Sequence, residues 1–84
     1  MYYCYILYSH ILDKYYIGYT QDLTSRLQKH LTNHKGFTGR VSDWEIVYYE
    51  EYSTKTEAYA RERYLKKQKS RRYIEKLISN TGSD

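Results

Sequence analysis

The chain has 84 residues, of which 40% are hydrophobic and 29% charged. This length allows one small domain, expected over residues 1–84, that buries about 60–65% of its unfolded surface. The same length excludes a membrane-helix bundle and a repeat array, and the composition is typical of a globular domain and excludes a disordered segment. Thirteen tyrosines accompany one Phe, one Trp and no Pro. Because tyrosine joins an apolar ring to a polar hydroxyl, these residues can build a small core and still present hydroxyl groups at a pocket.

The cysteine content and the first residues of the chain indicate a cytoplasmic protein. Cys4 is the only cysteine, so neither an intrachain disulfide nor a structural zinc cluster is expected. The opening segment MYYCYILYSHIL has no basic residue before its apolar stretch and does not fit a signal peptide. Nothing in the sequence has the length of a membrane span. We therefore expect no membrane partner.

Positive charge is concentrated in the second half of the chain. Residues 1–52 hold five Lys/Arg and six Asp/Glu, whereas residues 53–84 hold nine Lys/Arg and four Asp/Glu. Most of the excess lies in the segment 61–72, RERYLKKQKSRR. Such a run is either the solvated face of a helix or a surface that contacts phosphates of a nucleic acid. The second interpretation predicts contacts from this segment and from the loop HKGFTGR, through Arg61, Arg63, Lys66, Lys67, Lys69, Arg71 and Arg72, and through Lys35 and Arg40.

Three segments predict β-strands. Residues 2–9 and 15–19 are rich in aromatic and β-branched side chains, and residues 10–14 between them can close a hairpin. Residues 44–52 form the third strand, in which Trp44, Ile46 and Tyr48 alternate with residues of the opposite face. We expect these strands to pair mainly antiparallel.

Three segments predict helices. Residues 22–33 carry a stripe of leucines at i, i+4 and i+8 after Thr20 or Asp22 as a cap. A second helix begins at the capping box Thr54-x-x-Glu57 and runs to about Lys69, and a third covers about 71–79. The sequence therefore predicts an α+β fold, a three-stranded sheet flanked by three helices in the order β-β-α-β-α-α.

Glu62 is unusual because helical spacing places it on the same face as Ala58 and Leu65, which should meet the sheet. A carboxylate there costs free energy unless a cation satisfies it. Either a neighbouring arginine pairs with Glu62 at the helix edge, or Glu62 binds a metal ion.

Arg26 and His30 lie at i and i+4 on the first helix, where two cations repel each other weakly. The pair is explained if an anion lies between them. The alternative is that His30 is a hydrogen-bonded histidine at the edge of the core.

Tyr5, Tyr16 and Gly18 form a third candidate group on the hairpin. A four-residue loop that pairs Ser9 with Lys14 places Tyr5 and Tyr16 on the same face of the sheet. Glycine inside a strand indicates that another group approaches its backbone closely. The simpler interpretation is that both tyrosines belong only to the core.

In this order and spacing, the motifs resemble those of the GIY-YIG endonuclease superfamily, which includes phage homing endonucleases and the incision subunit of bacterial nucleotide-excision repair. The likeness covers roughly residues 2–78 and is greatest to small stand-alone bacterial members. It is carried by Tyr3-Cys4-Tyr5, by Tyr16-Ile17-Gly18, by Arg26-x-x-x-His30 and by Glu62 within EAYARERYLKK.

The resemblance implies roles for five residues. Tyr5 and Tyr16 would line the active site, where one of them activates the attacking water. Arg26 would stabilise the phosphate in the transition state, His30 stands where members carry His or Tyr, and Glu62 would hold one Mg²⁺ or Mn²⁺. The implied reaction is hydrolysis of a DNA phosphodiester bond that leaves a 5′-phosphate and a 3′-hydroxyl.

The resemblance, taken with these residues, implies a divalent-metal-dependent DNA endonuclease, with a structure-selective role in repair or recombination as one expectation. The main alternative is a nucleic-acid-binding module that keeps the fold without turnover, and a weaker one is a protein-interaction domain with a tyrosine surface. The nuclease interpretation requires the polar ends of the five residues to meet at one concave site.

Overall fold

The fold was analysed in a computed structural model that describes residues 1–32 and 41–81. Within these residues, three strands and three helices follow one another in the predicted order β-β-α-β-α-α, which confirms the α+β fold. The elements are β1 (Tyr2–Ser9), β2 (Lys14–Thr20), α1 (Leu23–Thr32), β3 (Glu45–Tyr52), α2 (Lys55–Gln68) and α3 (Arg71–Thr81). None of the described helices combines the length and the apolar composition that crossing a membrane requires.

The sheet has β1 at its centre, in the order β2-β1-β3, and both pairings are antiparallel. Ser9 pairs with Lys14 and Tyr5 with Gly18, which is the predicted hairpin register. Tyr16 lies two residues from Gly18 and therefore on the same face as Tyr5. The prediction that both tyrosines share a face is confirmed.

The strand β3 departs from the predicted alternation. Ile6 pairs with Tyr48 but Leu7 pairs with Ile46, so Val47 is an extra residue at a β-bulge. Ile46 consequently packs with Leu7 on one face, whereas Tyr48 packs with Ile6 on the other. The expectation that Ile46 and Tyr48 share one face was wrong, because the bulge reverses the alternation between them.

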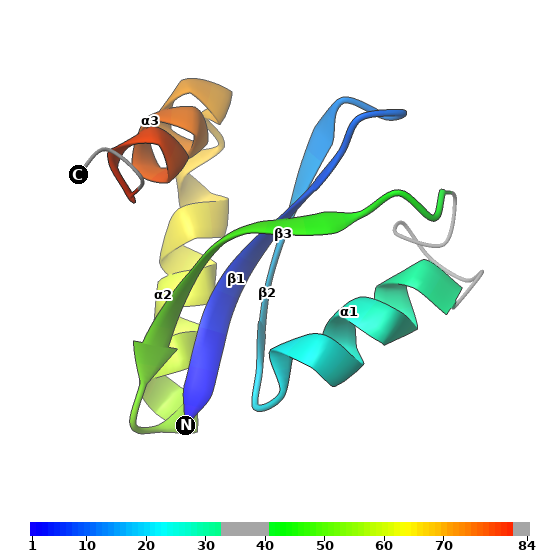
Figure 1. Cartoon of the computed structure of the whole chain (residues 1–84). Coiled ribbons are helices and arrows are strands. Elements are labelled where there is room, and N and C mark those ends of the chain that lie inside the picture. The colour runs from blue at the N-terminus through cyan, green and yellow to red at the C-terminus, as the bar shows by residue number, and fades with distance from the viewer. Residues whose placement is uncertain (33–40, 82–84) are drawn as a thin grey trace.

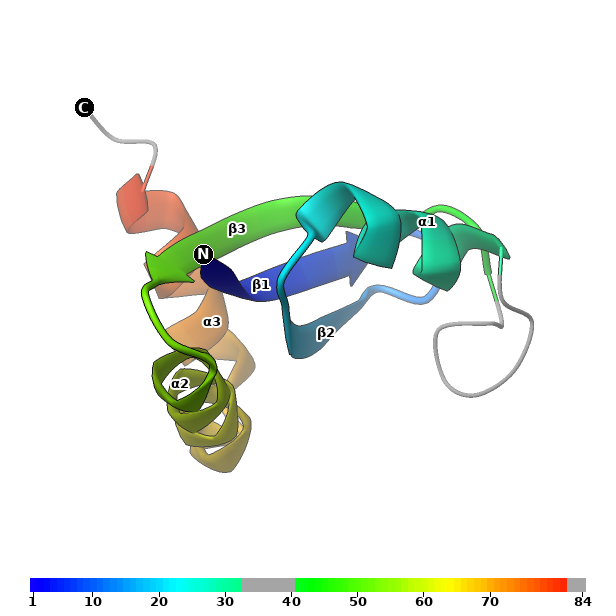
Figure 2. The same cartoon turned by 90° about the horizontal axis from the view of Figure 1, so that it is seen from below.

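Helices cover both faces of the sheet, as Figures 1 and 2 show, with α1 on one side and α2 and α3 on the other. Under α1 lie Tyr5, Leu7 and Trp44, packed against the predicted leucine stripe of this helix, Leu23, Leu27 and Leu31. On the other face, Cys4 and Ile6 of β1 form a buried cluster with Leu65 of α2 and Ile74 of α3. The central strand β1 thus supplies both cores.

Polar side chains fix where the helices begin. The carboxylate of Asp22 accepts a hydrogen bond from the backbone N–H of Ser25 at 3.1 Å, so Asp22 caps α1. The hydroxyl oxygen of Thr54 accepts from the N–H of Glu57 at 3.2 Å, and the same hydroxyl donates to the Glu57 carboxylate at 3.1 Å. The N-cap predicted for α2 is therefore present, and its glutamate supports the cap through the threonine side chain.

Candidate active site

A cleft of about 560 Å³ opens beside the hairpin. Its lining includes Tyr5 from β1, Tyr16 from β2, Arg26 from α1 and Glu62 from α2. Four of the five predicted site residues thus meet at one concave surface although they come from two strands and two helices. His30 is buried behind the cleft and is joined to it through Tyr5.

Tyr5 is the most deeply buried of these side chains, with 3% of its surface exposed. Its hydroxyl lies 2.9 Å from Nε2 of His30, in a buried hydrogen bond between β1 and α1. Burial raises the pKa of Tyr5 well above its usual range. Burial and the neighbouring charge of Arg26 lower the pKa of His30. Both shifts favour the neutral forms, and the direction of this hydrogen bond follows from which ring nitrogen of His30 carries the proton.

Gly18 allows the two site tyrosines to pack against the β2 backbone. A Cβ atom at this position would lie 2.6 Å from the Tyr5 hydroxyl oxygen, 2.8 Å from Cζ of the same ring and 3.2 Å from the Tyr16 ring. The first two distances are shorter than any normal carbon contact. The close approach inferred from glycine within a strand is confirmed, and the approaching groups are the two site tyrosines.

Glu62 is buried, with 8% of its surface exposed, and lies on the α2 face that carries Ala58 and Leu65. One oxygen of its carboxylate is 2.8 Å from Nζ of Lys66, one helical turn further along. The ion pair considered as an alternative from the sequence is therefore present, but its partner is a lysine and not an arginine. Glu62 still lines the cleft while it is paired.

Arg26 supplies positive charge to the same cleft. It is half-buried, and within the described part of the chain it forms no ion pair and no hydrogen bond through its guanidinium group. The cleft also contains Lys29 and Lys55, which were not among the residues predicted for the site. Lys29 was detectable, because it lies three residues after Arg26 on the same helix. The three cations make this cleft suited to an anion such as a phosphate.

The donor groups of the cleft are compatible with Mg²⁺. Among the described residues there is no cluster of three Asp, Glu, His or Cys side chains that could enclose a metal ion. Mg²⁺ does not require such a cluster, because it keeps several water ligands and is commonly held by one or two carboxylates together with substrate phosphates. Glu62 fits this pattern, in a cleft large enough for water and a phosphate. The second carboxylate of the lining, Asp22, is engaged in capping α1. Glu62 is the residue that would hold the ion.

The basic segment 61–72 is only partly available to a ligand. Arg61 donates to both oxygens of Glu50 on β3, at 2.9 and 3.1 Å, and Arg63 donates to the Tyr59 hydroxyl at 3.0 Å. In contrast, Lys67, Lys69 and Arg72 are exposed and have no ion pair with any described residue. The predicted contacts at Lys35 and Arg40 lie outside the described residues.

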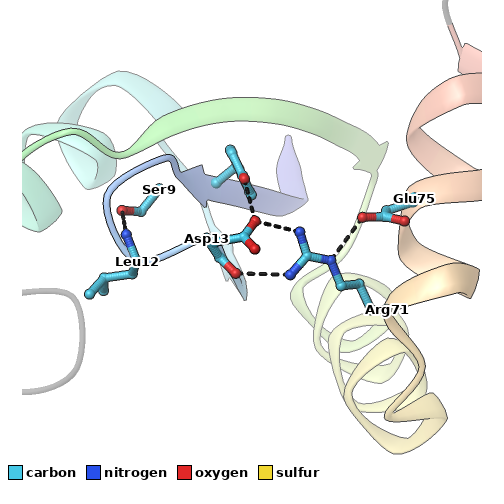
Figure 3. A network of polar contacts seen from close by, with 6 residues as sticks. Ser9, Leu12, Asp13, Arg71 and Glu75 are labelled. Atoms are coloured by element: carbon cyan, nitrogen blue, oxygen red, sulfur yellow. Dashed lines mark hydrogen bonds and ion pairs between the residues drawn. The ribbon is translucent and has the colours of Figure 1, made fainter.

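Arg71 holds α3 against the hairpin, as Figure 3 shows. Its guanidinium donates to the backbone oxygen of Asp13 at 2.9 Å and to its carboxylate at 2.5 Å, and donates to Glu75 at 2.8 Å. Tyr8 donates to the same Asp13 carboxylate. The contacts of Arg71 with Asp13 join residues 58 positions apart, so Arg71 has a structural role whether or not it also contacts a ligand.

Comparison with known proteins identifies relatives of this chain. Residues 1–76 match the family model described as the GIY-YIG catalytic domain. The UPF0213 protein BH0048 from Bacillus halodurans, known from a solution NMR structure, is similar over 99% of this chain and 88% of its own, with 33% identity and a TM-score of 0.59. No curated protein is similar enough to this chain to count as a match. The family match over nearly the whole chain shows that this protein belongs to the GIY-YIG nuclease family.

Proposed function

We propose that this protein is a divalent-metal-dependent endonuclease that hydrolyses phosphodiester bonds of DNA. The observation that carries the proposal is the meeting of Tyr5, Tyr16, Arg26 and Glu62 at one cleft. Nothing local in the sequence forces residues of four different elements together. Membership of a family that acts on nucleic acid supports the same conclusion.

The chemistry assigns a role to each group. Water adds to phosphorus and gives up a proton, the bond from phosphorus to the 3′ oxygen breaks, and that oxygen takes up a proton. The products carry a 5′-phosphate and a 3′-hydroxyl. Arg26 binds the non-bridging oxygens through its planar fork. Glu62 would hold a divalent ion, which when bound would supply positive charge for the leaving oxygen.

Water activation is assigned to the tyrosine pair. Tyr16 is half-buried and lies at the cleft, so its hydroxyl can contact the attacking water, whereas Tyr5 is almost fully buried. The rings of Tyr16 and His30 lie 4.8 Å apart, and His30 also contacts Tyr5. The lowered pKa of His30 favours its neutral form. Tyr5 and His30 can therefore hold Tyr16 in position without placing a positive charge beside the proton that the attacking water gives up.

Binding of the strand beyond the scissile phosphate is assigned to exposed cations. We expect Lys67, Lys69 and Arg72 to contribute most of the phosphate contacts of segment 61–72, because Arg61 and Arg71 are engaged with carboxylates. Branched or nicked DNA in repair or recombination remains the proposed substrate class, with the cytoplasm as the proposed compartment.

One observation favours the alternative, a nucleic-acid-binding domain without turnover. Lys66 already neutralises Glu62, so the carboxylate has a sufficient structural partner in the absence of a metal. The two functions differ in the step after binding, because only the nuclease releases products.

A cleavage assay separates them. Labelled duplex, flap, four-way junction and single-stranded DNA should be incubated with Mg²⁺, Mn²⁺ or EDTA. We expect metal-dependent cleavage that is lost in Glu62→Gln and Arg26→Ala and kept in Glu51→Gln, a matched change at an exposed glutamate on β3. Binding of all four DNAs without any product, or cleavage that persists in EDTA, would contradict the proposal.

A further inference from the structure

Among the residues that the structure describes, Lys66 is the cation that contacts the carboxylate of Glu62. Nζ of Lys66 lies 2.8 Å from Oε2, and among the described residues no other ion pair reaches this carboxylate. The two neighbouring arginines are directed elsewhere, Arg61 to Glu50 and Arg63 to Tyr59. The glutamate precedes the lysine by four residues, which is the favourable orientation for such a pair on a helix.

The two partners differ strongly in exposure. The side chain of Glu62 is 11% exposed, whereas that of Lys66 is 51% exposed. A buried carboxylate without a counter-ion is costly, so Glu62 needs a cation in every state of the protein. Lys66, in contrast, can leave the pair at small cost, because a half-exposed ammonium group regains water as it moves away.

The surroundings of Lys66 leave it room to move. Its ammonium group lies 6.0 Å from the centre of the Tyr16 ring. The residue also lines two open hollows, each of about 430 Å³, one of which it shares with Glu62. The side chain can therefore leave Glu62 without displacing a packed element.

We propose that Lys66 is the internal counter-ion of Glu62 and that a divalent metal ion must displace it to bind. This inference rests on the proposed function, because it takes Glu62 as the metal ligand. Lys66 and the metal ion compete for one carboxylate, so the lysine lowers metal affinity. It also holds the carboxylate in place while no metal is bound. Lys66 is thus a positioning residue of the site.

The test measures metal binding in the absence of nucleic acid. Mg²⁺ and Mn²⁺ should be titrated by calorimetry into the wild-type chain and into Lys66→Met, Lys66→Arg and Lys67→Met at constant ionic strength. Methionine keeps much of the length of the lysine stem but has no charge. Lys67→Met removes an adjacent exposed charge that has no contact with Glu62 and so corrects for general repulsion.

We expect Lys66→Met to bind the ion about twofold to fivefold more tightly than both the wild-type chain and Lys67→Met, the range typical of a half-exposed ion pair. Lys66→Arg should stay close to the wild-type affinity. Thermal unfolding provides a second measurement. Lys66→Met should have a lower Tm than wild type in EDTA, and this difference should shrink in saturating metal and be absent when Glu62→Gln is added.

Equal or weaker metal binding by Lys66→Met, including no binding by either protein, would overturn the proposal. So would an affinity gain of the same size in Lys67→Met. The cleavage assay distinguishes this failure from that of the proposed function. Metal-dependent cleavage that needs Glu62, together with unchanged affinity in Lys66→Met, would reject only the role of Lys66. The expected affinity pattern without cleavage of any DNA would reject only the nuclease.

Discussion

Replacement of Gly18 by alanine tests the geometry of the site most directly. The added methyl group would lie 2.6 Å from the Tyr5 hydroxyl oxygen and 2.8 Å from Cζ of that ring, so the ring must move. Tyr5 cannot rotate freely, because it is 3% exposed and bonded to His30. Overpacking of this kind costs about 1–3 kcal/mol. Alanine recovers about 0.4–1 kcal/mol by restricting the unfolded chain. The difference spans about 0–2.6 kcal/mol. Because the buried Tyr5 ring is held by His30, we expect a net loss near or above the middle of this range, about 1–2 kcal/mol, in the free energy of unfolding.

The assay is urea unfolding of Gly18→Ala, Tyr5→Phe and the double variant. Phenylalanine removes the oxygen responsible for the shortest contact, although the 2.8 Å contact with Cζ remains. The double variant should therefore be less destabilised than the sum of the single variants, by at least about 0.5 kcal/mol. A Gly18→Ala protein as stable as wild type, or strictly additive losses, would refute the assigned packing of Tyr5 against this glycine.

Three further predictions concern charge. Glu62→Gln should lose metal binding and cleavage but keep the fold, which calorimetry and circular dichroism can check; full activity would exclude Glu62 as the ligand. The pKa of His30 is lowered in the folded state. The stability that this shift contributes is therefore present above the pKa of the unfolded state, near 6.5, and is lost as the pH falls through the pKa of the folded state. Between pH 7.5 and 5, the free energy of unfolding should fall less in His30→Gln than in the wild-type chain, whereas His10→Gln should show no such reduction. Identical pH profiles of all three proteins would contradict this. Alanine at the exposed cations of the basic segment should weaken DNA binding and reduce the log–log salt slope by about 0.9 for each lost contact with B-DNA; an unchanged slope would place the phosphate contacts elsewhere. The three positions are Lys67, Lys69 and Arg72.

The predictable part of the fold is the part with a local signal. The hairpin register followed from a four-residue loop that pairs Ser9 with Lys14, and the placement of Glu62 followed from helical spacing. The ion pair from Glu62 to Lys66 also had a signal, because residues four apart are neighbours on a helix. From the sequence, only arginine was expected as the partner.

The remaining features depend on residues far apart in the chain. Ile46, Val47 and Tyr48 are all apolar, so no polarity pattern marks which of them is the extra residue of the bulge. The basic residues of segment 61–72 look alike in sequence, yet Arg61 pairs with Glu50 and Lys67 does not. Pairing across 11 residues, from a helix to a strand, is decided by packing and cannot be inferred from local charge.

The ion pair between Arg61 and Glu50 ties α2 to β3 and so opposes rotation of this helix about its own axis. Glu50 also accepts hydrogen bonds from Tyr48 and Tyr52, so three side chains hold its carboxylate in place on β3. Burial acts to raise the pKa of Glu50, but these donors outweigh it and lower the pKa, so the carboxylate stays charged. Residue 62 follows residue 61 by about 100° around the helix.

A rotation of α2 by about 20° would carry the carboxylate of Glu62, some 6 Å from the helix axis, through about 2 Å. Displacements of that size are enough to lower the rate of a positioned reaction by about a hundredfold or more. In the proposed nuclease, Arg61 would therefore align Glu62 without touching the substrate, and its loss would appear in turnover before it appeared in the content of folded protein.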